Sequence, residues 1–208
     1  MESKSKEAYE LDVKNLILHR SHLFVADNDL TTVVFEKVIA RHTRADCLIF
    51  SREKGIIGIE IKTARDSVAR LDHQIRDYEK VCNYVYVLIH DDMVEEVAPI
   101  VKPYGNVGII AYTEMGNNLY PGVVQPATLN ANQDLKAAFY HLTWSAEETR
   151  IARKVNQDKP LPVHRKNDMT KFLCDNYDKP ERLIWSLYYY QDFEPEHDIK
   201  SYEFASDA

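Results

Sequence analysis

The chain has 208 residues, of which 45% are hydrophobic and 28% charged, as in an ordinary soluble globular protein. A net charge of −7 excludes a surface that is basic throughout, and no apolar run reaches the roughly 20 residues that a bilayer-spanning helix needs. Three scattered cysteines without a CxxC pair argue against a zinc ribbon and a disulfide framework. We therefore expect one main domain with an extension, in a reducing, cytoplasmic setting without a membrane partner.

The first predicted elements follow from hydrophobic spacing. Apolar residues within 6–19 predict a helix, and turn residues at 27–29 lead into a β-branched strand at 31–39. Two short apolar runs rich in Ile, at 44–50 and 55–62, are bounded by polar residues or Gly. Such runs are typical of buried strands.

Helices and strands then alternate. Asp66 or Ser67 is predicted to cap a helix whose apolar side chains recur every three to four positions, so that one face packs on the sheet. A strand at 84–89, a short helix at 93–101 and a strand at 107–112 follow. The order of elements is αβββαβ with a further αβ pair, which predicts an α/β fold.

The composition changes after residue 116. Residues 117–132 contain two prolines, a glycine and several asparagines, which predict a linker or long loop. Residues 133–208 predict a small all-helical C-terminal region, in which Ser145 and Glu148 are spaced as in a capping box. The predicted helices of this region span 133–144, 145–156, 167–177 and 179–190.

Three charged residues stand on the two Ile-rich strands: Asp46 on the first, Glu60 and Lys62 on the second. Side chains alternate along a strand, so Glu60 and Lys62 share a face that Asp46 can also reach from the preceding strand. Charged groups on apolar strands are costly to desolvate unless they are paired or bind a metal. Two interpretations follow: an ion pair in which Lys62 bridges the two carboxylates, or a divalent-metal site, which we favour.

The segments Ala45-Asp46 and Glu60-Ile61-Lys62 resemble the PD-(D/E)xK nuclease superfamily, with Ala in place of the usual Pro. The resemblance continues in the next helix, which carries Gln74 and an aromatic residue, and it covers roughly residues 30–112. It implies a restriction-endonuclease-like αβββαβ core with a mixed sheet in residues 1–116.

The resemblance implies that the protein is an Mg²⁺-dependent deoxyribonuclease, which hydrolyses phosphodiester bonds. Asp46, Glu60 and the carbonyl of Ile61 would hold Mg²⁺, with Mn²⁺ able to substitute. Lys62 would hold the attacking water or stabilise charge developing on the phosphate.

Further residues are predicted to belong to the site. For Glu36 and Gln74, the alternative is that they are ordinary surface residues. Glu36, on the strand at 31–39, would add a carboxylate, and Gln74 would orient a phosphate or a water. Arg44 and Arg65 lie close enough in sequence to the motif to bind the backbone of DNA.

A local excess of positive charge lies in the C-terminal region. Residues 150–171 contain seven Lys or Arg and two Asp, whereas the chain end is acidic. The segment starting at His164 resembles the entry to a SAP-type DNA-binding hairpin, in which Arg165 and Lys166 would contact phosphates. A solvated helix start that happens to be basic is the alternative.

Two other classes of function stay open on the sequence. One is a catalytically silent protein with the nuclease fold that binds nucleic acid or a protein partner. The other is an unrelated α/β protein such as a small-molecule hydrolase, although the chain has no GxSxG motif and no phosphate-binding glycine loop. The sequence does not decide whether the substrate is DNA or RNA, or whether the enzyme is an endonuclease or an exonuclease. It also does not decide whether the chain forms a homodimer, as many relatives do.

Overall fold

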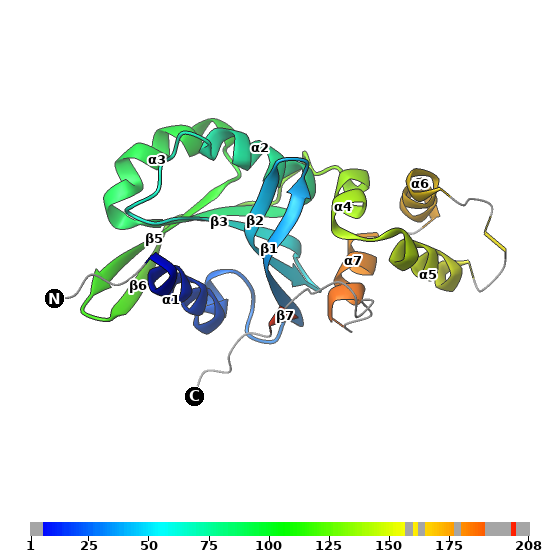
Figure 1. The fold of residues 1–208 in the computed structure, drawn as a ribbon, viewed down its shortest axis with the longest axis horizontal. Helices are drawn as coiled ribbons and strands as arrows, with labels where there is room; N and C mark the ends of the chain where they lie inside the picture. Colours follow the sequence, from blue (N-terminus) through cyan, green and yellow to red (C-terminus); the bar gives the residue numbers. More distant parts are fainter. Residues whose placement is uncertain (1–5, 157–159, 162–164, 177–179, 190–200, 203–208) are drawn as a thin grey trace.

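The computed structural model describes residues 6–156, 160–161, 165–176, 180–189 and 201–202. In this part of the chain, seven strands form one sheet in the order β6-β5-β4-β3-β2-β1-β7 (Figure 1). The strands are β1 (Thr31–Ala40), β2 (Thr43–Ser51), β3 (Gly55–Lys62), β4 (Tyr84–His90), β5 (Gly108–Met115), β6 (Asn118–Gln125) and β7 (Ser201–Tyr202). The sheet is mixed, because β4 runs parallel to β3 and β5 while the other neighbours are antiparallel.

Helices cover both faces of the sheet. They are α1 (Lys6–His19), α2 (Leu71–Val81), α3 (Val94–Val101), α4 (Leu135–Leu142), α5 (Ser145–Val155), α6 (Lys166–Asn176) and α7 (Pro180–Tyr189). Single 3-10 turns lie at η1 (Ser21–Leu23), η2 (Asp91–Met93) and η3 (Lys102–Tyr104). Helix α1 packs on one face, and α2 and α3 pack on the other (Figure 1). The α/β class predicted from the sequence is confirmed.

Strand β3 lies inside the sheet and is buried along its whole length. Its Ile57, Ile59 and Ile61 belong to the core that α1 covers. The alternate residues face α2, and these include Glu60 and Lys62. The period of two therefore places two charged side chains on a buried face of the sheet, as predicted.

The C-terminal helices share the core of the sheet. The rings of Phe50 on β2 and Tyr188 on α7 stack with their centroids 3.7 Å apart. Trp185 donates from Nε1 to the carbonyl of Leu30 at 2.9 Å. One cluster of buried side chains runs without a break from α2 and the strands into α4, α5, α6 and α7. Pro180 begins α7, as expected for a residue without an N–H.

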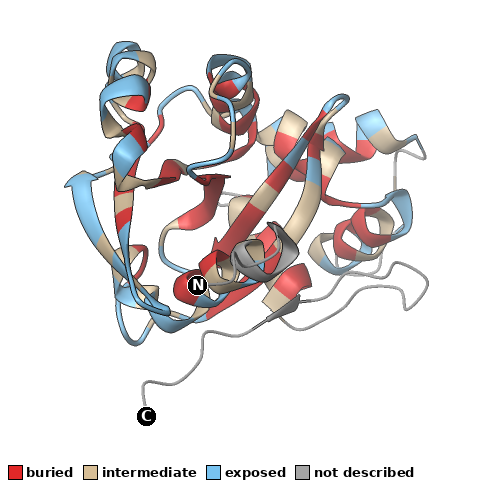
Figure 2. Cartoon of the chain, turned by 60° about the vertical axis from the view of Figure 1, so that its left-hand side comes forward, coloured by how far each residue is buried: buried red, intermediate tan, exposed pale blue. Residues whose placement is uncertain are grey.

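The prediction of a linker or loop at 117–132 is wrong for β6, which spans Asn118–Gln125 and pairs with β5. Proline was taken as a break, but β6 pairs on one side only and lies at the edge of the sheet. An edge strand accommodates Pro121, because an N–H on the open side has no ladder partner to lose. Figure 2 shows β6 largely exposed, in contrast to the buried central strands.

Two predicted helix caps also differ from the structure. Helix α2 begins at Leu71 and not at Asp66 or Ser67, because the Asp66 carboxylate accepts from the N–H and hydroxyl of Thr63 and closes a turn. The N-cap residue of α5 is Trp144, whose backbone N–H donates to Glu147 Oε2 at 2.6 Å.

Glu148, predicted to complete the capping box with Ser145, is instead fully buried. It accepts hydroxyl hydrogen bonds from Thr143 at 2.7 Å and Thr170 at 2.8 Å, and so ties α5 to α6.

None of the described helices combines the length and the apolar character needed to cross a membrane.

Candidate active site

Strands β2 and β3 separate at the end where the three motif residues lie. Their ladder ends at the pair Cys47 and Ile59. Beyond it, the N–H of Ile61 donates to Asp46 Oδ2 at 2.8 Å instead of to the backbone of β2. The open end, which we call the fork, therefore places the Asp46 carboxylate between the two strands.

Tyr78 of α2 holds the fork open. Its hydroxyl accepts from the N–H of Asp46 at 3.0 Å and donates to the carbonyl of Ile59 at 3.1 Å. Both backbone groups would otherwise lack a partner at the point where the ladder stops. The ring comes so close to β3 that a Cβ at Gly58 would lie 2.4 Å from Tyr78 Cδ1. Glycine is required at this position for α2 to approach.

Glu60, Lys62 and Gln74 form one hydrogen-bonded group beside the fork. Lys62 Nζ lies 2.7 Å from Glu60 Oε1 and 3.0 Å from Gln74 Oε1, and Gln74 Nε2 donates to the same Glu60 oxygen. Glu60 is only 1% exposed. Its second oxygen, Oε2, is buried and has no hydrogen-bond partner in the described part of the chain. A buried carboxylate oxygen without a donor is costly unless a cation binds it.

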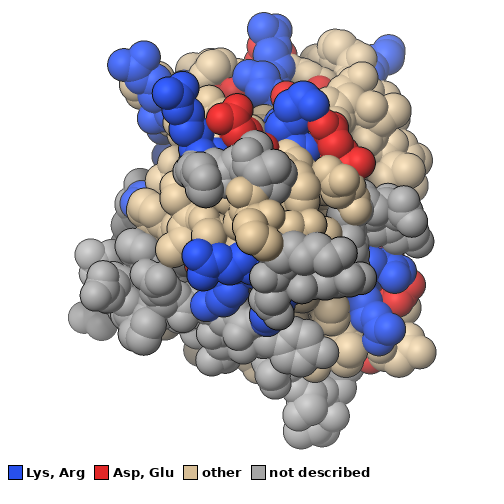
Figure 3. Space-filling model, turned by 90° about the vertical axis from the view of Figure 1, so that its right-hand side faces the viewer, with Lys and Arg blue, Asp and Glu red and all other residues tan. Residues whose placement is uncertain are grey.

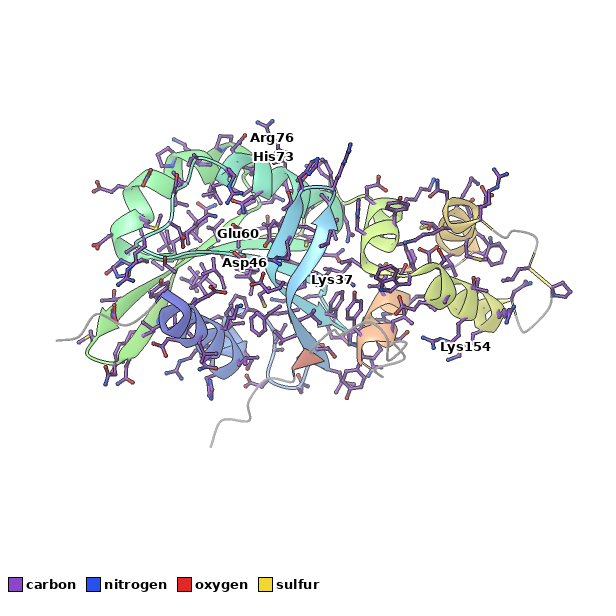
Figure 4. All side chains as sticks on the ribbon, viewed as in Figure 1. Lys37, Asp46, Glu60, His73, Arg76 and Lys154 are labelled. Atoms are coloured by element: carbon purple, nitrogen blue, oxygen red, sulfur yellow. The ribbon has the colours of Figure 1, made fainter. Side chains whose placement is uncertain are left out.

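The Asp46 carboxyl is half-buried and lies beside Glu60. Burial and the neighbouring Glu60 carboxylate raise the pKa of Asp46 to about 7, although the Ile61 N–H and the Lys62 charge act in the opposite direction. Asp46 takes part in none of the ion pairs formed within the described residues. Within the described residues, Lys62 forms an ion pair with Glu60 alone, so the interpretation in which it bridges both carboxylates is wrong for this structure. Figure 4 shows Asp46 and Glu60 on neighbouring strands, within the sheet.

These side chains open into a cavity of about 340 Å³. Asp46, Glu60, Lys62 and Gln74 all line it, together with Ile61. The cavity is also lined by three exposed arginines, Arg44, Arg65 and Arg70. The first two were predicted from their place next to the motif. Arg70 was missed because it immediately precedes α2, whose start was predicted several residues too early.

Glu36 lies on β1 and lines the same cavity. Its carboxylate pairs with Lys14 Nζ at 3.0 Å and Arg44 Nε at 2.9 Å. The backbone of Glu36 has a φ of 60°, the left-handed region that residues other than Gly rarely adopt. Residues with such backbone strain occur preferentially at active sites and ligand-binding sites.

Helix α1 contributes two residues that the sequence interpretation missed, Glu10 and Lys14. Both line the cavity, and Lys14 Nζ lies 2.8 Å from Glu10 Oε1. Burial lowers the pKa of Lys14, but hydrogen bonds to Glu10 and Glu36 outweigh that effect and raise it. The i, i+4 spacing of Glu10 and Lys14 was visible in the sequence. Nothing local indicated that this face of α1 meets the fork.

Lys166 and Arg165 lie elsewhere, at the start of α6. Lys166 Nζ donates to the carbonyls of Tyr140 at 2.7 Å and Thr143 at 2.6 Å, which stabilises the end of α4. Lys166 therefore has a structural role, and Arg165 is exposed but lines no part of the cavity. On the face shown in Figure 3, the described Lys and Arg side chains are separated by acidic and uncharged atoms. Lys154 on α5 lies far from Asp46 in Figure 4.

Among the described residues, one other group has metal-ligand spacing: His90, Asp91 and Asp92. Asp91 accepts from the Thr113 hydroxyl at 2.6 Å, and the neighbouring Asp92 is exposed. These carboxylates are solvated or already hydrogen-bonded and create no demand for a cation. The fork is the stronger candidate.

The fold and the site together define an α/β protein with two carboxylates and a lysine at a fork in a mixed sheet. The chain belongs to the bacteriophage P4 protein cII family, whose model matches residues 3–187. A solved structure, the SPO1766 protein of unknown function from Silicibacter pomeroyi, is similar over 74% of this chain and 94% of its own, with 15% identity and a TM-score of 0.44. No curated protein matches the chain.

Proposed function

We propose that this protein is a metal-dependent nuclease of the PD-(D/E)xK superfamily, with a restriction-endonuclease-like core, that hydrolyses phosphodiester bonds in DNA. The observation that carries the proposal is that, within the described residues, the buried Glu60 Oε2 has no hydrogen-bond partner and the neighbouring Asp46 forms no ion pair. The antiparallel β1-β2-β3 meander followed by the parallel β4 supports the fold assignment.

The donor atoms at the fork fit a hard divalent cation. Asp46, Glu60 and the carbonyl of Ile61 offer oxygen ligands, which Mg²⁺ and Mn²⁺ prefer. When bound, such a cation lowers the pKa of water and neutralises charge on a phosphate. It would also satisfy Glu60 Oε2, the buried carboxylate oxygen that has no hydrogen-bond partner within the described residues.

The other side chains have roles that follow from their contacts. Lys62 is held by Glu60 and Gln74, so that its ammonium keeps a fixed position in the cavity and can stabilise negative charge growing on the phosphate. Gln74 bonds to both residues and therefore positions the pair. The exposed arginines lining the cavity are suited to flanking phosphates of the substrate.

The test is incubation with supercoiled plasmid, linear duplex and single strands, each with Mg²⁺, Mn²⁺ or EDTA. We expect cleavage with either cation and none with EDTA. Lys62→Ala should lower the rate about 100-fold or more, because it removes the charge next to the phosphate. The control is Lys80→Ala, since Lys80 is an exposed lysine of α2 that pairs with Asp77 and lies outside the cavity.

Equal cleavage by the wild type and Lys62→Ala at matched purity would contradict the proposal. DNA binding without cleavage, together with no uptake of Mg²⁺ in calorimetry, would instead identify a catalytically silent binding protein. In that case Asp46→Asn would leave the affinity for DNA unchanged.

A further inference from the structure

We propose that the fork takes a single divalent cation, because Lys14 acts as an internal counter-ion for the remaining carboxylates of the cavity. This inference rests on the proposed function and specifies the stoichiometry of its metal site. It follows from how the charges that line the cavity are paired.

Five carboxylates line the cavity: Glu10, Glu36, Asp46, Glu60 and Asp66. A site with so many acidic groups has enough oxygen ligands for two cations about 4 Å apart, as two-metal nucleases have. Asp66 is engaged in the turn after β3, where it accepts from the N–H and hydroxyl of Thr63. The other four divide into two pairs in opposite states.

The pair nearer α1 is already neutralised. Lys14 Nζ lies 2.8 Å from Glu10 Oε1 and 3.0 Å from Glu36 Oε1, and Arg44 Nε lies 2.9 Å from the other Glu36 oxygen. A cation binding here would have to displace Lys14 from both carboxylates, and its double charge would be repelled by the ammonium at short range.

The pair at the fork lacks such neutralisation. Lys62 binds one oxygen of Glu60, but Glu60 Oε2 has no hydrogen-bond partner and Asp46 no ion pair within the described residues. Positive charge is therefore required at the fork alone.

The position of Lys14 is fixed by its surroundings. Its side chain is only 20% exposed, and its ammonium lies 5.5 Å from the centroid of the Phe35 ring. Two carboxylates and an aromatic face hold one ammonium in place, which is the arrangement of a permanent counter-ion rather than of a mobile surface lysine.

The experiment is a titration of the purified full chain with Mn²⁺, in which free Mn²⁺ is followed by electron paramagnetic resonance. We expect about one Mn²⁺ per chain for the wild type and about two for Lys14→Met, which keeps the length of the side chain but removes its charge. Lys14→Arg should stay at about one because the charge is kept. Lys80→Met is the control and should also stay at about one.

Two Mn²⁺ ions in the wild type, or one in a folded Lys14→Met protein, would overturn the inference. Binding of none by the wild type would instead contradict the proposed nuclease site itself, so the two failures are distinguishable. If Lys14→Met does not fold, Lys14→Gln, which keeps a hydrogen-bond donor, replaces it, and the wild-type stoichiometry remains decisive.

Discussion

Asp46 and Glu60 show how two identical functional groups acquire different states from their surroundings. Glu60 is buried and takes hydrogen bonds from Lys62 and Gln74 on one oxygen. Asp46 accepts a backbone N–H but has no ion pair within the described chain. The sequence indicated both residues, whereas their unequal pairing depends on where α2 places Gln74.

Asp46→Asn tests the raised pKa of Asp46. In metal-free protein the folded state holds the Asp46 proton more tightly than the unfolded state. This contribution to stability is complete below the unfolded pKa of about 4 and is lost as the pH rises through about 7. With EDTA, Asp46→Asn should therefore gain stability relative to the wild type between about pH 5 and about pH 8, measured by urea unfolding.

Mn²⁺ supplies the control for Asp46→Asn. At about pH 8 it should stabilise the wild type by mass action and leave the variant unchanged, because the amide is a poor ligand for a hard cation. A stability difference that does not change with pH would show that the Asp46 carboxyl titrates normally.

Glu36 allows the backbone strain to be separated from the ion pairs. Glu36→Gly and Glu36→Ala both remove the carboxylate, but only glycine adopts a φ of 60° without cost. We expect the glycine variant to be more stable by about 1 kcal/mol in urea unfolding, the reverse of the usual order in a strand. Greater stability of the alanine variant would mean that position 36 is not strained.

At the scale of elements, the fork depends on how α2 crosses β2 and β3. The sequence predicted both strands and the helix, and it predicted that the apolar face of this helix packs on the sheet. Periodicity describes which face a side chain occupies. It does not predict that the Tyr78 hydroxyl takes the place of a backbone hydrogen-bond partner for both the Asp46 N–H and the Ile59 carbonyl.

Tyr78→Phe should therefore weaken the metal site while leaving the ring packed. Loss of the hydroxyl leaves the Asp46 N–H and the Ile59 carbonyl without a partner, at a cost of about 1–3 kcal/mol. The affinity for Mn²⁺ should fall about tenfold or more, because the group that positions a ligand is lost. Calorimetry with Mn²⁺ gives the affinity, and urea unfolding gives the stability.

Tyr188→Phe is the matched control, because Tyr188 is also fully buried and its hydroxyl donates to the carbonyl of Leu142, away from the cavity. It should lose stability but keep the affinity for Mn²⁺. If both variants lose affinity equally, Tyr78 contributes only to general stability.

Across the molecule, the sheet and the C-terminal helices share one hydrophobic core. The cluster that contains Phe50 and Tyr78 also contains Phe139 and Tyr188. Removing residues 133–208 would expose the face of β1 and β2 that α4 and α7 cover. Residues 1–116 have the predicted order of elements, but the later helices are needed to bury the apolar face of β1 and β2.

A fragment of residues 1–132 should therefore fail to fold cooperatively. We expect it to lose near-ultraviolet circular dichroism, to bind ANS and to aggregate, because a large apolar face stays in water. The full chain, measured under the same conditions, is the reference. A fragment with a sharp thermal transition would show that the sheet is stable without the helices.

Hydrophobic periodicity and side-chain alternation are local properties of the chain, so most of the helices and strands and the charged face of β3 could be predicted from the sequence. It also determined that Asp46, Glu60 and Lys62 belong together, since charges on apolar strands need partners. The folded structure was needed to show that β6 is an edge strand, that Lys166 caps α4, and that α1 brings Glu10 and Lys14 to the cavity. The contacts of Lys166 and of α1 join segments far apart in the chain, for which no local pattern exists, whereas β6 pairs with β5, which directly precedes it.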